Sequence, residues 1–373
     1  MAGTQEASAP RVVLAGGGTG GHVFPGLAVA EELAQVFDSV PLLYVGARGG
    51  IEESLVPASG LRLEVVRSVK TSGLLGYARL PFAMIAAMRA AGRLLDDFAP
   101  DVVVALGGYA SCPPALAARR RGLPVVVLEQ NAIPGRVSRF LSRYASEIHA
   151  TYRESVERFA RPERVKVTGN PVRRAILDVA RARRARGAGE RLSLLVAGGS
   201  QGARRLNQLL VEALKRLEDL APVLRVVHLA GRKNCESARR ASAGLAVEVE
   251  VVGFEEDMAG RYLECDLVLS RAGATALAEI SACGIPALLV PYPHAKDNHQ
   301  EANARSFAEA GAARLLNESE LNGQALADAL RELLQDGRRR AEMAEKMLEK
   351  GRPGAGAEIA RRLVAIAAGG SSA

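Results

Sequence analysis

Short, uninterrupted apolar runs alternate with longer helical patterns along the whole chain, and this alternation limits the possible folds more than any other feature. Apolar runs of this length are typical of strands that are buried on both faces. Such strands belong to parallel sheets with helices on each side. The sequence therefore predicts an α/β fold. The expected strands are 11–15, 42–45, 63–66, 101–106, 125–128, 148–151, 192–197, 224–229, 247–252, 267–270 and 287–290.

The pattern occurs twice. Each half opens with an apolar strand, then a glycine-rich turn (16–22 and 198–203), and then a helix. A segment rich in Arg, Ala and Gly, 181–191, precedes the second of these strands. The length of 373 residues suits two domains of about 150–200 residues. Two Rossmann-like domains with parallel sheets are predicted. They are residues 1–168, joined by the C-terminal helix within 352–373, and residues 169–351.

Charge and aromatic content narrow the choice of partners. The net charge of +8 favours an acidic partner: a nucleic acid, an anionic bilayer or a pyrophosphate substrate. A genome that favours Arg and Ala codons is an alternative source of this charge. Aromatic residues make up only 4% of the chain, without Trp, and the sequence contains no nucleic-acid reader motif. We therefore expect no nucleic-acid partner.

The first glycine-rich turn, G-G-G-T-G-G-H at 16–22, follows a strand and precedes a helix expected to start near Pro25. Such a turn lets the backbone approach a phosphate, and the helix amino end supplies N–H donors. The turn lacks the Lys of a P-loop. The second expected strand leads into Gly46–Arg48 without an acidic residue, which argues against NAD. A plain tight turn remains the alternative.

The second half has three polar or small-residue turns at strand ends. In 198–203, Ser200 is either a phosphate ligand or a helix N-cap. In 271–279, small residues leave room for a pyrophosphate, and Glu279 is placed to bind ribose hydroxyls unless it is simply solvated. The loop 291–300 carries His294 and His299 without a third metal ligand, so zinc is not expected.

Taken together, seven segments resemble one family in order and spacing. It is the bacterial UDP-N-acetylglucosamine–N-acetylmuramyl-(pentapeptide) pyrophosphoryl-undecaprenol N-acetylglucosamine transferase family, which makes lipid II from lipid I. The resemblance implies a GT-B fold, in which two Rossmann-like domains face each other across a cleft, and transfer of GlcNAc from UDP-GlcNAc with inversion. The segments are G-G-G-T-G-G-H-V-F-P-G-L-A-V-A (16–30), A-L-G-G-Y-A-S (105–111), E-Q-N (129–131), G-N-P-V-R (169–173), G-G-S-Q-G-A (198–203), R-A-G-A-T-A-L-A-E-I (271–280) and D-N-H-Q (297–300).

The resemblance also implies a donor site. Arg173, Ser200 and the amides near Ala274 and Thr275 would hold the UDP pyrophosphate. Glu279 would bind the ribose, and the backbone at 254–255 would bind the uracil edge. No D-x-D triplet is present to hold a divalent ion, so no metal or cofactor is expected. The implied donor-binding residues are Thr19, Gly20, Gly21, Asn131, Arg173, Ser200, Glu255, Ala274, Thr275, Glu279, His299 and Gln300.

On the acceptor side, His22 is the candidate general base, because an ordinary imidazole titrates near neutral pH. An orienting role for His22 remains equally open, and Glu129 is the reserve candidate. One departure from the family is Leu128, where a His is often found. The residues expected to cradle the pyrophosphate of lipid I are Gly17, Gly18, Gly107, Gly108, Tyr109 and Ser111.

A membrane surface is the other expected partner. The apolar segment 74–85 leads into an Arg-containing helix, a combination that favours an anionic bilayer. A buried helix face over 80–95 is the alternative. Residues 1–10 do not predict a signal peptide. The resemblance implies a lipid substrate in the bilayer, and with it a peripheral position at the cytoplasmic face of the plasma membrane and other cell-wall synthesis proteins as candidate partners. The expected docking residues are Leu74, Leu75, Leu80, Phe82, Ile85 and Arg89.

Three other functions fit parts of the pattern. A GT-B transferase with a different acceptor would share the donor site. A sugar-nucleotide epimerase of the same shape would act on the donor alone, and a scaffold protein would bind UDP without turnover. Dependence of UDP release on the acceptor separates these functions.

Overall fold

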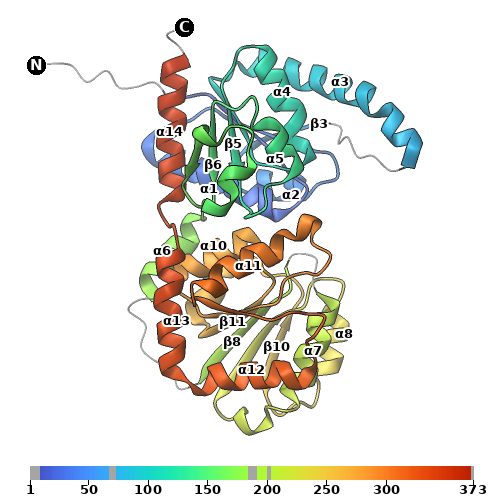
Figure 1. Cartoon of the computed structure of the whole chain (residues 1–373), viewed down its shortest axis with the longest axis vertical. Helices are drawn as coiled ribbons and strands as arrows, with labels where there is room; N and C mark the ends of the chain where they lie inside the picture. The colour runs from blue at the N-terminus through green and yellow to red at the C-terminus, as the bar shows by residue number, and fades with distance from the viewer. Residues whose placement is uncertain (1–8, 67–72, 184–190, 200–202, 371–373) are drawn as a thin grey trace, which may run out of the picture. The chain divides into compact units, whose positions relative to one another are not determined.

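The computed structural model describes residues 9–66, 73–183, 191–199 and 203–370, with side chains except at 73–80 and 370. The chain forms two compact units, Met1–Arg173 with Gly354–Ala373, and Arg174–Pro353. Figure 1 shows the elements of each unit. The boundary predicted after residue 168 falls a few residues before the one observed after Arg173.

The first unit contains a seven-stranded parallel sheet in the order β3-β2-β1-β4-β5-β6-β7. The chain moves outward from β1 to β3 and then returns to β4 on the other side of β1. The carboxyl ends of β1 and β4 therefore flank the switch point at which such sheets bind ligands. The strands are β1 Val12–Ala15, β2 Leu42–Ala47, β3 Arg62–Val66, β4 Val102–Ala105, β5 Val125–Glu129, β6 Glu147–Ala150 and β7 Val165–Val167.

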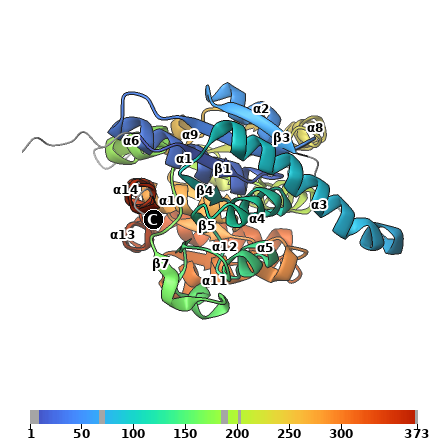
Figure 2. The same ribbon diagram turned by 90° about the horizontal axis from the view of Figure 1, so that it is seen from above.

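Helices cover both faces of this sheet, each over its own apolar cluster. The helix α3 extends beyond the rest of the unit in both views (Figures 1 and 2). The last helix, α14, packs on α1, and its Ile359 and Leu363 share an apolar cluster with Leu14. The helices are α1 Gly20–Val36, α2 Glu52–Ala58, α3 Gly73–Phe98, α4 Cys112–Arg120, α5 Arg136–Leu141 and α14 Ala355–Gly370, and η1 Tyr109–Ser111 is a 3₁₀ turn.

The second unit repeats the arrangement with a six-stranded parallel sheet in the order β10-β9-β8-β11-β12-β13. Its switch point lies between β8 and β11. The strands are β8 Leu192–Ala197, β9 Leu224–Leu229, β10 Glu248–Val252, β11 Leu267–Ser270, β12 Ala287–Leu289 and β13 Ala313–Leu315. The helices are α6 Arg174–Arg183, α7 Arg204–Leu214, α8 Cys235–Ser242, α9 Met258–Glu264, α10 Ala274–Cys283, α11 His299–Glu309, α12 Gly323–Gln335 and α13 Gly337–Lys350.

The predicted α/β class is confirmed, and each predicted strand is present with small shifts at its ends. The helix expected to start near Pro25 instead begins at Gly20, which corrects that prediction. Proline is common where a helix begins, so its position suggested the start. Here Pro25 lies inside the helix, and His22 belongs to the first turn of α1 instead of the preceding loop.

Candidate active site

The two glycine turns of the first unit meet at His22. His22 Nδ1 lies 3.1 Å from the carbonyl oxygen of Gly17, in the turn after β1. A Cβ atom added to Gly107, after β4, would lie 2.8 Å from His22 Cδ2. Gly107 and Gly108 also have φ values of +101° and +72°, which residues other than glycine rarely adopt. These glycines therefore let the backbone lie against the imidazole ring.

The Gly17 contact assigns the tautomer of His22. A carbonyl oxygen only accepts hydrogen bonds, so the shorter of the two contacts of Nδ1 favours a hydrogen on Nδ1 and a lone pair on Nε2 of the neutral ring. The Thr19 hydroxyl, 3.4 Å from Nδ1, can accept from the same hydrogen. A base needs such a lone pair. Two other histidines, His149 on β6 and His228 on β9, differ from His22 because they are buried. Burial lowers the pKa of each to about 4, so both are neutral at neutral pH.

The reserve candidate Glu129 holds a loop together. It is buried at the end of β5, and its Oε1 accepts hydrogen bonds from the main-chain N–H and side-chain amide of Asn131 at 3.0 and 3.2 Å. Its Oε2 accepts one from the N–H of Gly135 at 3.0 Å. Next to it, Gln130 donates to the carbonyl of Leu106 at 3.0 Å and so ties β5 to the turn after β4. The sequence motif E-Q-N marked this place but not the role of Gln130.

Two groups of the predicted acceptor cradle have partners within the protein. The Gly18 N–H donates to Glu52 Oε2 at 2.8 Å. The hydroxyl of the buried Ser111 donates to the Gly108 carbonyl at 2.9 Å. Tyr109 has 51% of its surface exposed. Gly18 and Ser111 thus shape the two turns, and Tyr109 lies at the surface beside them.

Arg173 lies beside the first turns of α1. Its guanidinium is 4.4 Å from the ring centroid of Phe24, a cation–π contact. The predicted donor residues Thr19, Gly20 and Gly21 form the start of the same helix, with Thr19 as its N-cap. One end of α1 therefore gathers four of the predicted donor-binding residues. The sequence showed no pairing of Arg173 with Phe24.

In the second unit, the switch point holds the start of α10. Ala197 of β8 is in register with Ser270 of β11, so the turns that follow both strands are neighbours. Gly273 caps α10, and Ala274 and Thr275 form its first turn, where helix N–H groups point outward. Of the predicted residues here, Ser200 lies outside the described residues. The start of α10 is suited to an anionic ligand.

Glu279 is buried, with 4% of its surface exposed, and is not a solvated helix residue. Its Oε2 accepts a hydrogen bond at 3.2 Å from the hydroxyl of Tyr262, on α9. This bond orients the carboxylate. The sequence predicted a role for Glu279 but not for Tyr262, which lies on α9, 17 residues earlier in the chain.

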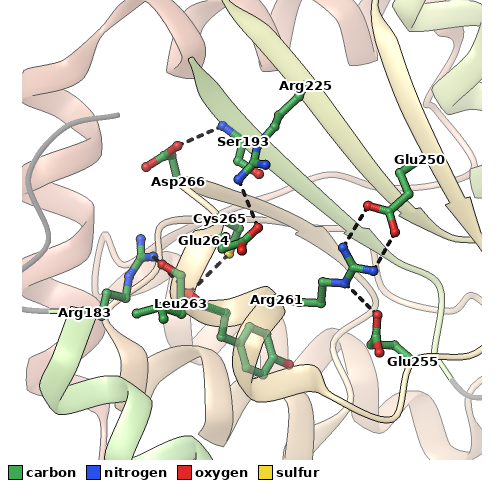
Figure 3. Close-up of polar contacts among 11 residues, drawn as sticks. Arg183, Ser193, Arg225, Glu250, Glu255, Arg261, Leu263, Glu264, Cys265 and Asp266 are labelled. Carbon is green, nitrogen blue, oxygen red and sulfur yellow. Dashed lines mark hydrogen bonds and ion pairs between the residues drawn. The ribbon is translucent and has the colours of Figure 1, made fainter. Parts of the chain in front are cut away.

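An ion-pair network fixes the segment between β10 and α9 (Figure 3). Arg261 donates to both oxygens of Glu250, at 2.6 and 2.8 Å, and its Nε donates to Glu255 at 2.6 Å. Its hydrogen bonds to Glu250 and Glu255 raise the pKa of Arg261 above the ordinary value. Arg232 lies 4.5 Å from the ring centroid of Phe254. The backbone at 254–255, predicted to contact uracil, is thus firmly held.

The loop after β12 is ordered by its own side chains. Gln300 accepts a hydrogen bond from the Tyr292 N–H at 2.9 Å, and His299 Nδ1 lies 2.7 Å from the Lys296 carbonyl. Arg271 forms a buried ion pair with Glu318 and donates to the carbonyls that follow β12. Among residues 9–66, 73–183, 191–199 and 203–370, no cluster of three His, Cys, Asp or Glu side chains has the arrangement of a metal site.

The predicted docking segment is partly described. Phe82 and Ile85 on α3 have 76% and 43% of their surfaces exposed, and Arg89 is exposed as well. The side chains of Leu74, Leu75 and Leu80 lie outside the described part. Residues of α3, of α4 and of its C-cap line a cavity of about 270 Å³, namely Met88, Arg89, Arg93, Ala117, Arg120 and Arg121. In the described part of the chain, no helix has the length and apolarity needed to cross a bilayer.

Both units match known sequence families. The glycosyltransferase family 28 N-terminal domain matches residues 12–150, and the C-terminal domain of that family matches residues 193–359. A UDP-N-acetylglucosamine–N-acetylmuramyl-(pentapeptide) pyrophosphoryl-undecaprenol N-acetylglucosamine transferase of Myxococcus xanthus is 42% identical over 352 residues, which are 94% of this chain and 91% of that protein.

Solved structures agree with the sequence matches. The crystal structure of Acinetobacter baumannii MurG has a TM-score of 0.76 and 31% identity, and the match covers 95% of this chain and 99% of that one. A UDP-N-acetylglucosamine 2-epimerase has a TM-score of 0.66 with 16% identity, over 95% of this chain and 94% of that one. At that identity the epimerase shares the fold alone.

Proposed function

The chain belongs to glycosyltransferase family 28, among the UDP-N-acetylglucosamine–N-acetylmuramyl-(pentapeptide) pyrophosphoryl-undecaprenol N-acetylglucosamine transferases, and we propose that it converts lipid I to lipid II with UDP-GlcNAc as the donor. Its 42% identity to such a transferase, over 94% of the chain, carries this conclusion. The epimerase alternative has only the fold in its favour. The protein is therefore an N-acetylglucosaminyltransferase of peptidoglycan synthesis.

Product analysis tests this function. Purified protein, a lipid I analogue and UDP-GlcNAc should give a product heavier than the acceptor by one N-acetylhexosamine. The new linkage should be β, since inversion of the α-linked donor is proposed. A sugar-nucleotide product formed without acceptor would instead support the epimerase function.

The proposed reaction is a single in-line displacement. The acceptor hydroxyl oxygen bonds to the anomeric carbon of GlcNAc while the bond from that carbon to the UDP oxygen breaks. His22 Nε2 takes the hydroxyl proton. The amino end of α10 stabilises the charge that leaves with UDP. Glu279 holds the ribose, and Asn131 contacts the transferred sugar.

We expect turnover to be independent of divalent metal ions. The N–H groups at the amino end of α10 supply the stabilisation of UDP that a metal gives in other transferases. Activity should therefore be unchanged in EDTA and show no increase when Mg²⁺ is added. Loss of activity in EDTA with full recovery in Mg²⁺ would contradict this expectation.

We also propose that α3 docks on the cytoplasmic face of the plasma membrane through its exposed apolar residues Phe82 and Ile85. Phe82 is 76% exposed, and the arginines between α3 and α4 suit anionic lipid headgroups. Phe82→Asp should weaken binding to phosphatidylglycerol vesicles by about 10-fold or more, since burial of a Phe side chain contributes about 1.5–3 kcal/mol.

The matched control is Val36→Asp, because Val36 is an exposed apolar residue of the same unit but lies at the end of α1. Val36→Asp should leave vesicle binding unchanged. Phe82→Asp should leave the turnover of a water-soluble acceptor unchanged. Equal weakening of vesicle binding by both substitutions would argue against docking through α3.

A further inference from the structure

One peptide group connects His22 with a buried carboxylate. The carbonyl of Gly17 accepts the hydrogen of His22 Nδ1, at 3.1 Å. The N–H of Gly18 belongs to the same planar peptide group and donates to Glu52 Oε2 at 2.8 Å. Imidazole, peptide and carboxylate thus form one continuous chain of hydrogen bonds within the first unit.

The protein is built closely around this carboxylate. Glu52 has no exposed surface, and its second oxygen accepts the Ala47 N–H at 2.8 Å. Three glycines surround it: a Cβ atom would lie 1.9 Å from a Glu52 oxygen at Gly17 and 2.2 Å at Gly50, and 2.5 Å from its Cγ at Gly46. Any larger residue there would displace the carboxylate or the loop.

Glu52 has the features of an ionised group without a cationic partner. Both of its oxygens accept N–H groups, as a carboxylate does. Among the residues that the structure describes, no Lys, Arg or His forms an ion pair with it. Burying a charge in this way is costly, and the negative charge acts strongly on nearby dipoles because water is excluded.

We propose that Glu52 is a positioning residue that orients and polarises His22 through the Gly17–Gly18 peptide. The Glu52 charge polarises the peptide group through the Gly18 N–H, and this makes the Gly17 carbonyl oxygen a stronger acceptor. Hydrogen bonds in such a chain reinforce one another. This holds the proton on Nδ1, keeps the lone pair on Nε2 and stabilises the imidazolium that forms when the acceptor hydroxyl is deprotonated. The Asp of a Ser-His-Asp triad acts similarly but directly. The proposal rests on the proposed role of His22 as base.

Other titratable groups lie on the surrounding elements, among them the exposed Arg48 in the loop between β2 and α2. Burial raises the pKa of Tyr44, on β2, and the Glu52 charge raises it further, so Tyr44 stays neutral. Glu129, at the end of β5, accepts hydrogen bonds from its own loop. Glu53, on α2, accepts one from the Gly49 N–H at 3.1 Å. Tyr109 follows the Gly107 turn and is exposed, and Arg173 lies over Phe24 on α1.

The test compares Glu52→Gln with Glu53→Gln in the full-length protein. Glu53 is the matched control, since it is the next residue of α2 but exposed. Glu52→Gln should lower kcat by about 10- to 100-fold. This fall is smaller than the one caused by loss of a carboxylate that contacts a catalytic His directly. KM values should change little, and the acidic limb of the pH profile of kcat/KM should move to lower pH. Glu53→Gln should behave like the unaltered enzyme.

An NMR titration of His22 separates this proposal from the proposed function, because it needs no turnover. The midpoint should move to lower pH in Glu52→Gln and stay close to the original in Glu52→Asp, which retains the charge. Nitrogen chemical shifts of the unaltered protein should show the Nδ1–H tautomer. An Nε2–H tautomer, or the same midpoint in Glu52→Gln, would overturn the role of Glu52. If instead the midpoint moves but His22→Gln keeps full activity, the base assignment fails while the coupling to Glu52 stands.

Discussion

His22→Gln is expected to lower kcat by about 10²–10⁴-fold, the usual contribution of a general base. Gln keeps a polar group of similar reach but cannot take a proton at neutral pH. The ring contacts of His22 involve the loops of the first unit, so donor binding in the second unit should persist. Steady-state kinetics with UDP-GlcNAc and a lipid I analogue measure the effect, and calorimetric UDP binding verifies that the variant is folded.

The same experiment decides between the two roles that the sequence left open for His22. A base predicts a large fall in kcat and loss of the acidic limb of the pH profile. A residue that only orients the sugar predicts a higher KM for the acceptor, a fall in kcat of less than about 10-fold, and an unchanged pH profile. The second result would make Glu129 the next residue to test.

Glu279→Gln is expected to raise the Kd for UDP by about 10- to 100-fold. Hydrogen bonds to a charged group contribute about 1.5–3 kcal/mol each, and about 1.4 kcal/mol corresponds to tenfold in affinity. The buried carboxylate, already oriented by Tyr262, would accept ribose hydroxyls. Tyr262→Phe removes only this orienting bond, so its effect on Kd should be a few-fold, in line with about 0.5–1.5 kcal/mol for a neutral hydrogen bond.

Isothermal calorimetry with UDP measures both variants. Glu264→Gln is the matched control, because Glu264 is an acidic residue of α9 whose pairing with Arg225 is at the surface. It should bind UDP like the unaltered protein. Unchanged affinity in Glu279→Gln as well would remove this carboxylate from the donor site.

The central strands of both sheets were predictable, because strands buried on both faces are continuous apolar runs. The strands β7 and β13 were not. Each has three residues, lies at a sheet edge and contains a charged residue, Lys166 or Arg314. Edge strands of this kind bury too little surface to leave an apolar pattern.

The glycine turns were also predictable, since they stand directly after apolar strands. Glu279 was predictable because it lies early in the helix that follows such a turn. The residues that support them were not, because support comes from distant parts of the chain. Glu52 bonds to Gly18 34 residues away, and Tyr262 bonds to Glu279 17 residues away. In sequence, Glu52 and Glu53 are equivalent acidic residues at a helix start, and only the fold buries one of them and exposes the other.

Release of UDP from UDP-GlcNAc, with and without a lipid I analogue, tests the central claim most directly. UDP-GalNAc serves as the control donor. The proposed function predicts rapid release only when the lipid I analogue and UDP-GlcNAc are present together. Tight UDP binding without acceptor-dependent release would contradict the assignment of lipid I as acceptor, while leaving the fold and the donor site in place.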